Sequence, residues 1–407
     1  MAHRIDADLL LPGKGDPVPN GSVVIDGGGI TYAGPASGAP SVDGTTTKVA
    51  TVLPGLWECH GHFTGIVRAD LEHEAKEPVA VKTARAMKDV HATLAAGVTS
   101  VREVGGLGIY IDRAITEGHA QGPKIYGAGS ILSTTGGHAD AHGLPLAWMN
   151  GLHETEAFAC LADGVPECLK AVRRQLRKGA SVIKVCASGG VASELDHPIH
   201  QQFSDEELRA IVDEAGRAER AVAAHCHGKP GIMAALRAGV KTIEHGSYLD
   251  EEAADAMKES GAVLVPTRFI IQELLGMEAV LPPYIYRKAV EIADRHELAM
   301  KIAVSAGVTI ATGSDIILSG SMYGQNSREV RHLIEAGMTP LEAVEAATAN
   351  GPLTLGPKAP MSGQLREGYD ADVIAFDGDP LADLDVWGDA SRVTHVWKGG
   401  ELVKSPA

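Results

Sequence analysis

No stretch of the sequence is apolar for long enough to cross a membrane, and no leader peptide is recognisable. A membrane-spanning helix needs about 18 consecutive apolar residues, and this chain of 407 residues contains no such run. Its first ~30 residues also lack the basic segment and apolar core of a secretory signal. We therefore expect a cytoplasmic protein with no membrane partner, although a secreted protein that has lost its leader would show the same pattern.

Cysteine and basic residues are both in short supply, and each shortage disfavours a class of protein. The five cysteines are odd in number and include no Cys-x-x-Cys pair, which argues against a disulfide framework and against a thiolate zinc site. Lysine and arginine total 36 against 52 acidic residues, for a net charge of −16. Because such a surface repels phosphate backbones, we expect no nucleic-acid partner.

The middle of the chain alternates short β-branched runs with amphipathic helical stretches, the pattern of a parallel α/β protein. Eight runs have the length of barrel strands: 51–56, 99–102, 124–127, 182–185, 221–224, 242–244, 263–266 and 309–311. Eight is the number that a closed barrel needs. We therefore predict a (β/α)₈ TIM barrel over residues 51–356.

The two ends of the chain are rich in Gly and Pro turns between short strand-like runs. These runs are 22–25, 30–33 and 46–49 near the start, and 372–376, 393–398 and 402–404 near the end. Each end is too short to bury a core of its own. We expect residues 1–50 and 357–407 to pair into one small β-sandwich domain.

Helix starts and long loops complete this prediction. Ser204 with Glu207, and Thr339 with Glu342, have the spacing of capping boxes, so each pair marks the start of a helix. Residues 131–163 and 268–297 are long for barrel loops, and long loops on this architecture usually shape the active site.

Histidines cluster at the ends of the predicted strands. His60 and His62 follow the first strand, and strand alternation places both on the side that faces the barrel mouth. Two imidazoles at that spacing can share one metal ion. His225 and His227 repeat the pattern after a later strand, and His245 ends the next one.

Lys184 and Asp315 add to this arrangement. Lys184 lies within the otherwise apolar strand 182–185, where an ammonium is costly unless it is paired or chemically changed. Asp315 follows the eighth predicted strand. Each residue alone has a structural explanation. Together, however, they all fall at the carboxyl ends of barrel strands, the face that carries the active site in such folds.

The order His-x-His, Lys, His, His, Asp resembles the amidohydrolase superfamily, and most closely its ochratoxinase and prolidase-like carboxypeptidase branch. The stretches that carry this resemblance are TGGHAD at 135–140, IKVCASGGV at 183–191, AHCHGK at 224–229, GQLREG at 363–368 and DADVI at 370–374. Glu58 and Glu103 stand where the family usually has Asp, which changes the length of two carboxylate arms.

The resemblance implies a hydrolase of C–N bonds with two divalent metal ions, for which zinc suits the nitrogen and oxygen ligands. His60, His62 and Asp315 would hold one ion, and His225 and His245 the other. Lys184, carboxylated by CO₂, would bridge the two. Asp315 would also carry the proton to the leaving nitrogen.

The resemblance also implies a substrate with a free carboxylate on the amine side of the scissile bond. We expect N-acyl-L-amino acids or dipeptides with a hydrophobic C-terminal residue, ochratoxin A included, to be cleaved by a homo-oligomeric enzyme. His138, His227 and Arg268 are the candidates for binding this substrate, and Arg268 could equally be a structural ion-pair residue. A cyclic-amide or lactone hydrolase of the same superfamily and a non-catalytic metal-binding protein are the alternatives.

Overall fold

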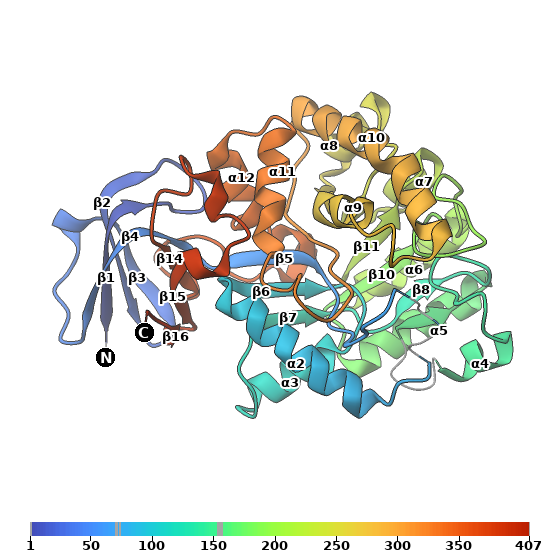
Figure 1. The fold of residues 1–407 in the computed structure, drawn as a ribbon, viewed down its shortest axis with the longest axis horizontal. Coiled ribbons are helices and arrows are strands. Elements are labelled where there is room, and N and C mark those ends of the chain that lie inside the picture. The colour runs from blue at the N-terminus through green and yellow to red at the C-terminus, as the bar shows by residue number, and fades with distance from the viewer. Residues whose placement is uncertain (1, 70–71, 73–74, 153–157, 407) are drawn as a thin grey trace.

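The computed structural model describes residues 2–69, 72, 75–152 and 158–406. Figure 1 shows a β-sheet at one side of the molecule, built from both ends of the chain, beside a larger body of parallel strands wrapped by helices. Among the described residues, no helix has the length and apolarity needed to span a membrane.

The first body is one seven-stranded sheet with the order β16-β15-β14-β4-β1-β2-β3. Its strands are β1 (His3–Leu10), β2 (Val18–Asp26), β3 (Gly29–Pro35), β4 (Thr46–Pro54), β14 (Val373–Phe376), β15 (Val393–Lys398) and β16 (Glu401–Lys404). Ile5, Val52 and Trp397 are buried in its core. The two chain ends therefore pair as predicted, but in one sheet, and the second layer of a sandwich is not confirmed.

The second body holds two parallel sheets. One has the order β5-β6-β7 and the other the order β13-β12-β11-β10-β8-β9. Their strands are β5 (Leu56–Gly61), β6 (Val98–Glu103), β7 (Lys124–Gly127), β8 (Ile131–Ser133), β9 (Ala159–Leu161), β10 (Val182–Cys186), β11 (Ala221–Cys226), β12 (Thr242–His245) and β13 (Val263–Val265). Backbone hydrogen bonds also connect these sheets to residues outside them: Cys59 N in β5 donates to Thr312 O at 2.9 Å, and Ser181 N donates to Gly127 O in β7 at 2.8 Å.

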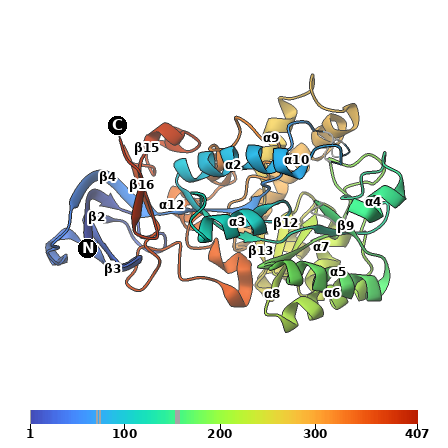
Figure 2. The same cartoon turned by 90° about the horizontal axis from the view of Figure 1, so that it is seen from below.

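Helices cover the outside of the parallel strands (Figure 2). They are α2 (Val79–Ala95), α3 (Gly108–Thr116), α4 (Leu146–Leu152), α5 (Gly164–Lys178), α6 (Asp205–Arg217), α7 (Lys229–Ala238), α8 (Glu251–Ser260), α9 (Arg268–Leu275), α10 (Pro283–Ala306), α11 (Glu329–Glu335) and α12 (Pro340–Ala347). Short 3₁₀ turns lie at Ala36–Gly38, Asn326–Arg328, Pro352–Lys358, Leu384–Val386 and Ala390–Arg392. The capping boxes predicted at Ser204 and Thr339 are confirmed at the starts of α6 and α12.

The prediction of a single strand over 51–56 was wrong. β4 ends at Pro54 in the seven-stranded sheet, and β5 begins at Leu56 beside β6. A side chain could not replace Gly55 between them, since a Cβ there would lie 2.0 Å from Thr99 Oγ1. The chain thus passes from one sheet to the other within a residue, and the unbroken apolar run conceals the change.

Three further predictions need correction. Residues 309–311 form no named strand, only an isolated parallel bridge between Ile310 and Leu264. The supposed loop 131–163 contains β8, α4 and β9, with residues 153–157 outside the described part. The supposed loop 268–297 is mostly α9 and α10. β8 and β9 have three residues each, too few for a period to be recognised. α10 has 24 residues, and its helical pattern was overlooked.

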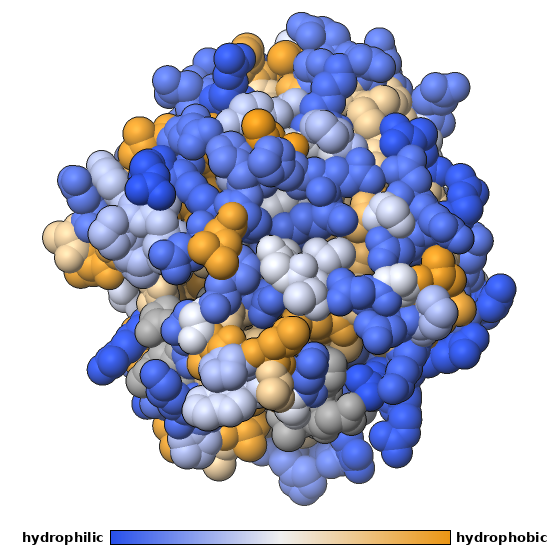
Figure 3. Space-filling view, turned by 90° about the vertical axis from the view of Figure 1, so that its right-hand side faces the viewer, coloured by the Kyte–Doolittle hydropathy of each residue, from blue (hydrophilic) through white to orange (hydrophobic). Residues whose placement is uncertain are grey.

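The face turned away from the seven-stranded sheet is mostly hydrophilic, with apolar side chains in separate small patches (Figure 3). This agrees with the excess of acidic over basic residues.

Candidate metal centre

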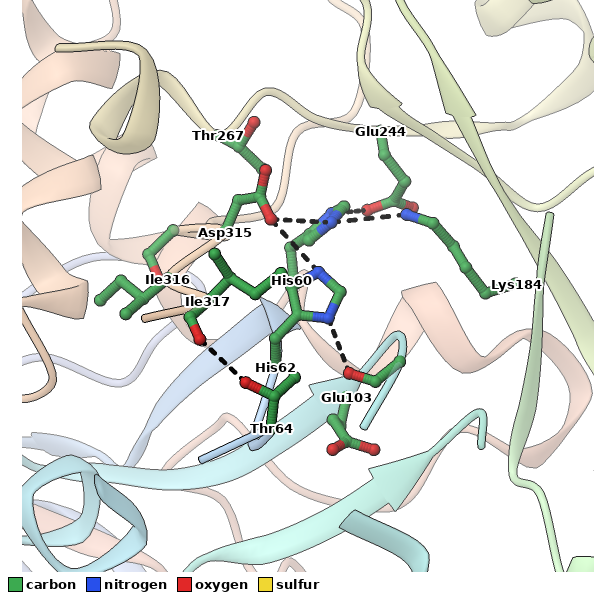
Figure 4. A network of polar contacts seen from close by, with 12 residues as sticks. His60, His62, Thr64, Glu103, Lys184, Glu244, Thr267, Asp315, Ile316 and Ile317 are labelled. Carbon is green, nitrogen blue, oxygen red and sulfur yellow. Dashed lines mark hydrogen bonds and ion pairs between the residues drawn. The ribbon is translucent and has the colours of Figure 1, made fainter. Parts of the chain in front are cut away.

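Strand ends bring the six predicted ligands around one cavity of about 130 Å³. The residues that line it include His60, His62, Lys184, His225, His245 and Asp315. Figure 4 shows His60, His62, Lys184 and Asp315 converging from β5, β10 and the segment after Ile310. The sequence argument therefore placed these side chains together correctly.

The first group of donors is His60, His62 and Asp315. The Asp315 carboxylate lies 3.2 Å from His62 Nε2 and 3.6 Å from His60 Nε2. One ligand atom from each residue falls within 4.8 Å of the others, a spacing at which all three could hold one ion.

The second group is His225, His227 and His245, which meet the same 4.8 Å limit. The rings of His227 and His245 are stacked at 4.8 Å between centroids, and His225 meets His245 edge-on at 4.7 Å. His227, which the sequence assigned to substrate binding, therefore lies within reach of the same ion as His225 and His245.

Each of the four predicted ligand histidines uses one ring nitrogen for a contact with the protein, which leaves the other nitrogen available to a metal ion. His60 Nδ1 donates to Glu244 Oε2 at 2.7 Å, and His62 Nδ1 donates to Gly105 O at 2.7 Å. His245 Nδ1 is hydrogen-bonded to Thr267 Oγ1 at 2.6 Å, whereas His225 uses Nε2, which donates to Gly189 O at 3.1 Å. Fixing one nitrogen in this way orients the ring and leaves the other as a lone-pair donor.

Burial disfavours the charged form of His60, His225 and His245. It lowers the pKa of His60 to about 4, with the Lys184 ammonium adding to the effect, and it lowers the pKa of His225 and His245 well below the ordinary value. Because a metal ligand must be the neutral imidazole, the chemistry of the donor set fits divalent cations.

Lys184 lies between the two groups of donors. Its Nζ is 3.4 Å from His60 Nε2, and the residue is buried. No carboxylate among the described residues hydrogen-bonds to Nζ, and burial lowers the pKa of the amine. A buried amine that ionises less readily is suited to reaction with CO₂, since only the neutral form is nucleophilic.

Sequence analysis missed the ion pair that supports His60. Arg102 NH2 donates to both oxygens of Glu244, at 2.8 and 2.7 Å, and both side chains are fully buried. Although burial alone would raise the pKa of Glu244, the Arg102 guanidinium lowers it below its ordinary range. The sequence did contain a signal for this ion pair. Glu244 is a charged residue within the apolar strand 242–244, just as Lys184 is within its own strand.

The backbone is left-handed at three non-glycine residues of the site. Thr267 has φ 55°, Asp315 φ 57° and His245 φ 70°. Such conformations cost of order 1–3 kcal/mol each when the residue is not glycine, and they cluster at functional sites. The fold therefore holds three groups in costly backbone conformations. They are Asp315 from the first group of donors, His245 from the second group, and Thr267, whose hydroxyl orients His245.

Two buried glutamates support the segments that carry the ligands. Glu58 accepts hydrogen bonds from Ser314 Oγ at 2.6 Å and Asn326 Nδ2 at 2.8 Å, which ties β5 to the residues before Asp315. Glu103 Oε1 accepts from Gly108 N at 2.8 Å and Phe63 N at 3.3 Å. Both stand where the related family usually has Asp, and neither lines the cavity.

Glu103→Gln is expected to change how stability depends on pH. Burial raises the pKa of Glu103 from 4.5 to about 8, so the folded protein holds a proton that the unfolded chain releases. The stability from this group is complete below pH 4.5 and is lost as pH rises towards 8. Relative to the Gln variant, the wild type should lose up to about 1.4 kcal/mol per pH unit in that window.

Urea unfolding of both proteins at several pH values measures this difference. Glu259→Gln on the exposed end of α8 is the matched control and should follow the wild-type profile. Parallel curves for the wild type and Glu103→Gln between pH 4.5 and 8 would contradict the prediction.

Arg268 does not line the cavity. Its NH1 donates to Ala293 O at 2.7 Å, and its NH2 donates to Glu297 Oε2 at 3.3 Å, so the guanidinium joins α9 to α10. The arginine that does line the cavity is Arg68, an exposed residue that the sequence did not indicate. His138, predicted on a loop, lines the cavity next to His225.

Most of the remaining cavity wall is apolar. It includes Ile66, Ile131, Phe158, Val191, Ile270, Ile271, Leu274, Met277, Leu281, Ile285, Ile317, Leu318 and Met322. The donors at the base of the cavity thus face a hydrophobic chamber, the usual composition of a pocket for a small organic ligand.

Comparison with known proteins agrees with this site. A sequence profile of the Amidohydrolase family matches residues 51–403. Ochratoxinase from Aspergillus niger is 43% identical over 419 positions, covering 99% of this chain and 86% of ochratoxinase. The crystal structure of A. niger ochratoxinase has a TM-score of 0.94 and covers 100% of this chain and 96% of that one.

Solved structures of a prolidase and a dipeptidase also match along the full length of both chains. A prolidase complexed with N-methylphosphonate-L-proline is 35% identical, with a TM-score of 0.92 and 100% coverage of each chain. A Xaa-Pro dipeptidase with methionine bound in its active site is 30% identical, with a TM-score of 0.87 and the same 100% coverage of each.

Proposed function

We propose that this chain, which belongs to the amidohydrolase family, cleaves the amide bond of N-acyl-L-amino acids or of dipeptides with a hydrophobic C-terminal residue, ochratoxin A included. It is a hydrolase that acts on amide bonds. The observation that carries the finer proposal is the apolar cavity with a cluster of neutral histidines at its base. We also propose that the parallel strands close into a (β/α)₈ barrel, a proposal supported by the hydrogen bond from Cys59 N to Thr312 O.

Two divalent cations, for which zinc fits the ligand types, would occupy the cluster. His60, His62 and Asp315 would hold one, and His225 and His245 the other, with Lys184 carboxylated so that it reaches both. When bound, such a pair polarises the scissile carbonyl and lowers the pKa of water towards neutrality.

Asp315 has the position required of a proton carrier. Although burial alone would raise its pKa, the neighbouring His60 and His62 lower it, so the carboxylate is ready to accept a proton. It would take this proton from the attacking water and pass it to the amide nitrogen. An aliphatic amine leaves poorly unless it is protonated, so this transfer decides whether an amide is cleaved.

The substrate class follows from the cavity wall. One hydrophobic side chain of the leaving amino acid would be buried against α9 and the start of α10, where Ile270, Leu274 and Ile285 lie. Burial of such a side chain is worth ~1.5–3 kcal/mol. Arg68, in place of Arg268, would bind the carboxylate of the substrate at the cavity mouth.

The test of this function compares N-acetyl-L-phenylalanine with its C-terminal amide. The free acid should have the larger kcat/KM by about 10- to 100-fold, because a charge-assisted hydrogen bond is worth about 1.5–3 kcal/mol. Equal rates would remove the carboxylate from the proposal. If the enzyme cleaves a hydantoin or lactone but neither N-acetyl-L-phenylalanine nor its amide, the cyclic-substrate alternative is favoured. If the metal-loaded protein cleaves none of these compounds, a non-catalytic metal-binding protein is favoured.

Lys184→Ala is expected to abolish hydrolysis, because the variant loses the carbamate that would reach both metal ions. A short carboxylic acid such as propionate should restore part of the activity by occupying the vacated position. Titration of propionate against the rate measures this rescue, and Lys178→Ala, on the helix before β10, is the control that should need none. A protein with full activity and full metal content whose measured mass equals that of the unmodified chain would contradict the carbamate.

A further inference from the structure

A chain of polar contacts leads from the base of a loop to the cavity through three residues. Asp196 Oδ1 accepts a hydrogen bond from Ser193 Oγ, and Ser193 Oγ lies 2.8 Å from His138 Nδ1. His138 lines the cavity at the side of His225. Neither Ser193 nor Asp196 belongs to the candidate metal centre described above. The series of contacts from Asp196 to His138 therefore needs a separate explanation.

Asp196 is held as a carboxylate. Its Oδ2 accepts from Gly190 N and from Gln202 Nε2, each at 3.0 Å, and its Oδ1 lies 3.3 Å from Lys288 Nζ. Although burial alone would raise the pKa of Asp196, the hydrogen bonds from Ser193 and Gly190 and the ammonium of Lys288 lower it. An ionised carboxylate can only accept hydrogen bonds.

The count of protons then fixes the tautomer of His138. Ser193 has one hydroxyl proton, and its shortest contact is with the Asp196 carboxylate, so that proton goes to Asp196. Ser193 Oγ must therefore accept the proton of His138 Nδ1. In a neutral imidazole with hydrogen on Nδ1, the second nitrogen, Nε2, carries a lone pair and is an acceptor.

Close packing holds the ring in this orientation. One face of His138 is stacked on His225, with 4.2 Å between centroids and 17° between planes. Gly190 lies against the ring so closely that a Cβ there would be 2.2 Å from His138 Nδ1 and Cε1. Nε2 has no hydrogen-bond partner among the described residues and is not sealed from the cavity that the ring lines.

We propose that His138 Nε2 accepts a hydrogen bond from the N–H of the scissile amide, so that the enzyme selects secondary amides. This inference rests on the proposed function. The substrates named above offer the amide N–H as a donor near the bond that breaks, whereas their carboxylate can only accept. Neutral His138 would therefore repel the carboxylate and bind the amide. Once water has added to the carbonyl carbon, the nitrogen regains its lone pair, which points away from the engaged N–H and could take the proton from Asp315.

The same geometry makes Ser193 a positioning residue. Without its hydroxyl, the Nδ1 proton of His138 has no acceptor, and the tautomer with hydrogen on Nε2 becomes available. Ser193→Ala would then place a donor where the acceptor had been, while the ring remains between Gly190 and His225. The preference of the enzyme for an N–H should fall although His138 itself is unchanged.

The experiment measures kcat/KM for two substrates that differ at one atom, in variants of the metal-loaded enzyme. N-acetyl-L-phenylalanine has the N–H, and O-acetyl-L-phenyllactate has an ester oxygen in its place. His138→Leu should lose about 10-fold more on the amide than on the ester, the worth of about one hydrogen bond. His138→Gln, which can put an oxygen near the position of Nε2, should recover most of the loss, and Ser193→Ala should behave like His138→Leu.

Metal content and the ester rate separate the possible failures. Unchanged ester hydrolysis with full metal shows that the site is intact, so an unchanged amide rate in His138→Leu would overturn the inference while the proposed function stands. Equal losses on amide and ester would also overturn it. A loss that depends on the free carboxylate, seen against the C-terminal amide, would assign His138 to the carboxylate instead. If the wild type cleaves neither substrate, the proposed function itself fails.

Discussion

Asp315→Asn is expected to lower kcat by ~10²–10⁴ while the protein keeps its metal, the range typical of a general acid–base group. Asn retains an oxygen near His62 Nε2, which lies 3.2 Å from the Asp315 carboxylate, but it cannot accept and return a proton. The substitution should add no backbone strain, because Asp315 has φ 57° and Asn tolerates this left-handed conformation well.

Steady-state kinetics with metal analysis of the same samples would check this result. The unfolding midpoint of Asp315→Asn should match the wild type, which confines the effect to chemistry. His62→Ala is the comparison variant, since it should lose metal and activity together. A near-normal kcat in Asp315→Asn would mean that another group carries the proton.

Arg102→Met is expected to lower the free energy of unfolding by about 3–5 kcal/mol, because it leaves the buried Glu244 without its cation. The guanidinium and the carboxylate are both fully buried and 2.7 Å apart. Arg102 also donates to Cys59 O at 2.7 Å and Thr242 Oγ1 at 2.7 Å, so its loss leaves several acceptors unpaired. Since Glu244 orients His60, metal affinity should fall as well.

Urea unfolding of metal-free wild type and variant measures the stability difference. Arg113→Met removes an exposed ion pair to Glu117, whose atoms are 2.8 Å apart, and should give no measurable change. An effect for Arg102→Met as small as that of the control would show that water or a protonated Glu244 compensates for the missing charge.

The candidate metal ligands could be brought together from the sequence because the prediction needed only a few facts about each residue. His60, His225 and His245 each stand at the end of an apolar run, and parallel strands present their carboxyl ends at one edge. Lys184 stood out because a charge within an apolar strand requires a reason. These signals are local in the sequence, and the topology of the fold brings the residues together.

The parts that sequence could not give depend on contacts made far along the chain. The division between β4 and β5 lies inside one apolar run and becomes visible only when β14 pairs with the first part and β6 with the second. For Arg268 the sequence left substrate binding and a structural ion pair open, for a similar reason, and its contacts agree with the ion pair. Its position after a strand suggested the cavity, but its acceptors lie on α10, which the sequence had treated as a loop.

Substrate-binding residues were harder still, because their role depends on protons and not only on position. His138 was predicted as a donor to a carboxylate, whereas we propose, from its contact with Ser193 and that of Ser193 with Asp196, that Nε2 is an acceptor. Ser193 lies well apart from His138 in sequence, and no spacing rule connects them. Arg68 follows β5 without any motif and is found only by its place on the cavity wall.

The pairing of β4 with β14 has a consequence for how a nascent chain acquires its site. Pro54 pairs with Val373 and Thr51 with Phe376, so β4 has an open edge until residues near the end of the chain leave the ribosome. β5, which carries His60, continues directly from β4. β5 pairs early with β6 on one edge, but on its other side Cys59 N donates to Thr312 O, so the strand that carries this candidate ligand is also completed only late in synthesis. An unpaired strand edge during that interval is a hazard for aggregation, and a chaperone that holds residues 46–54 until β14 arrives should raise the yield of folded protein.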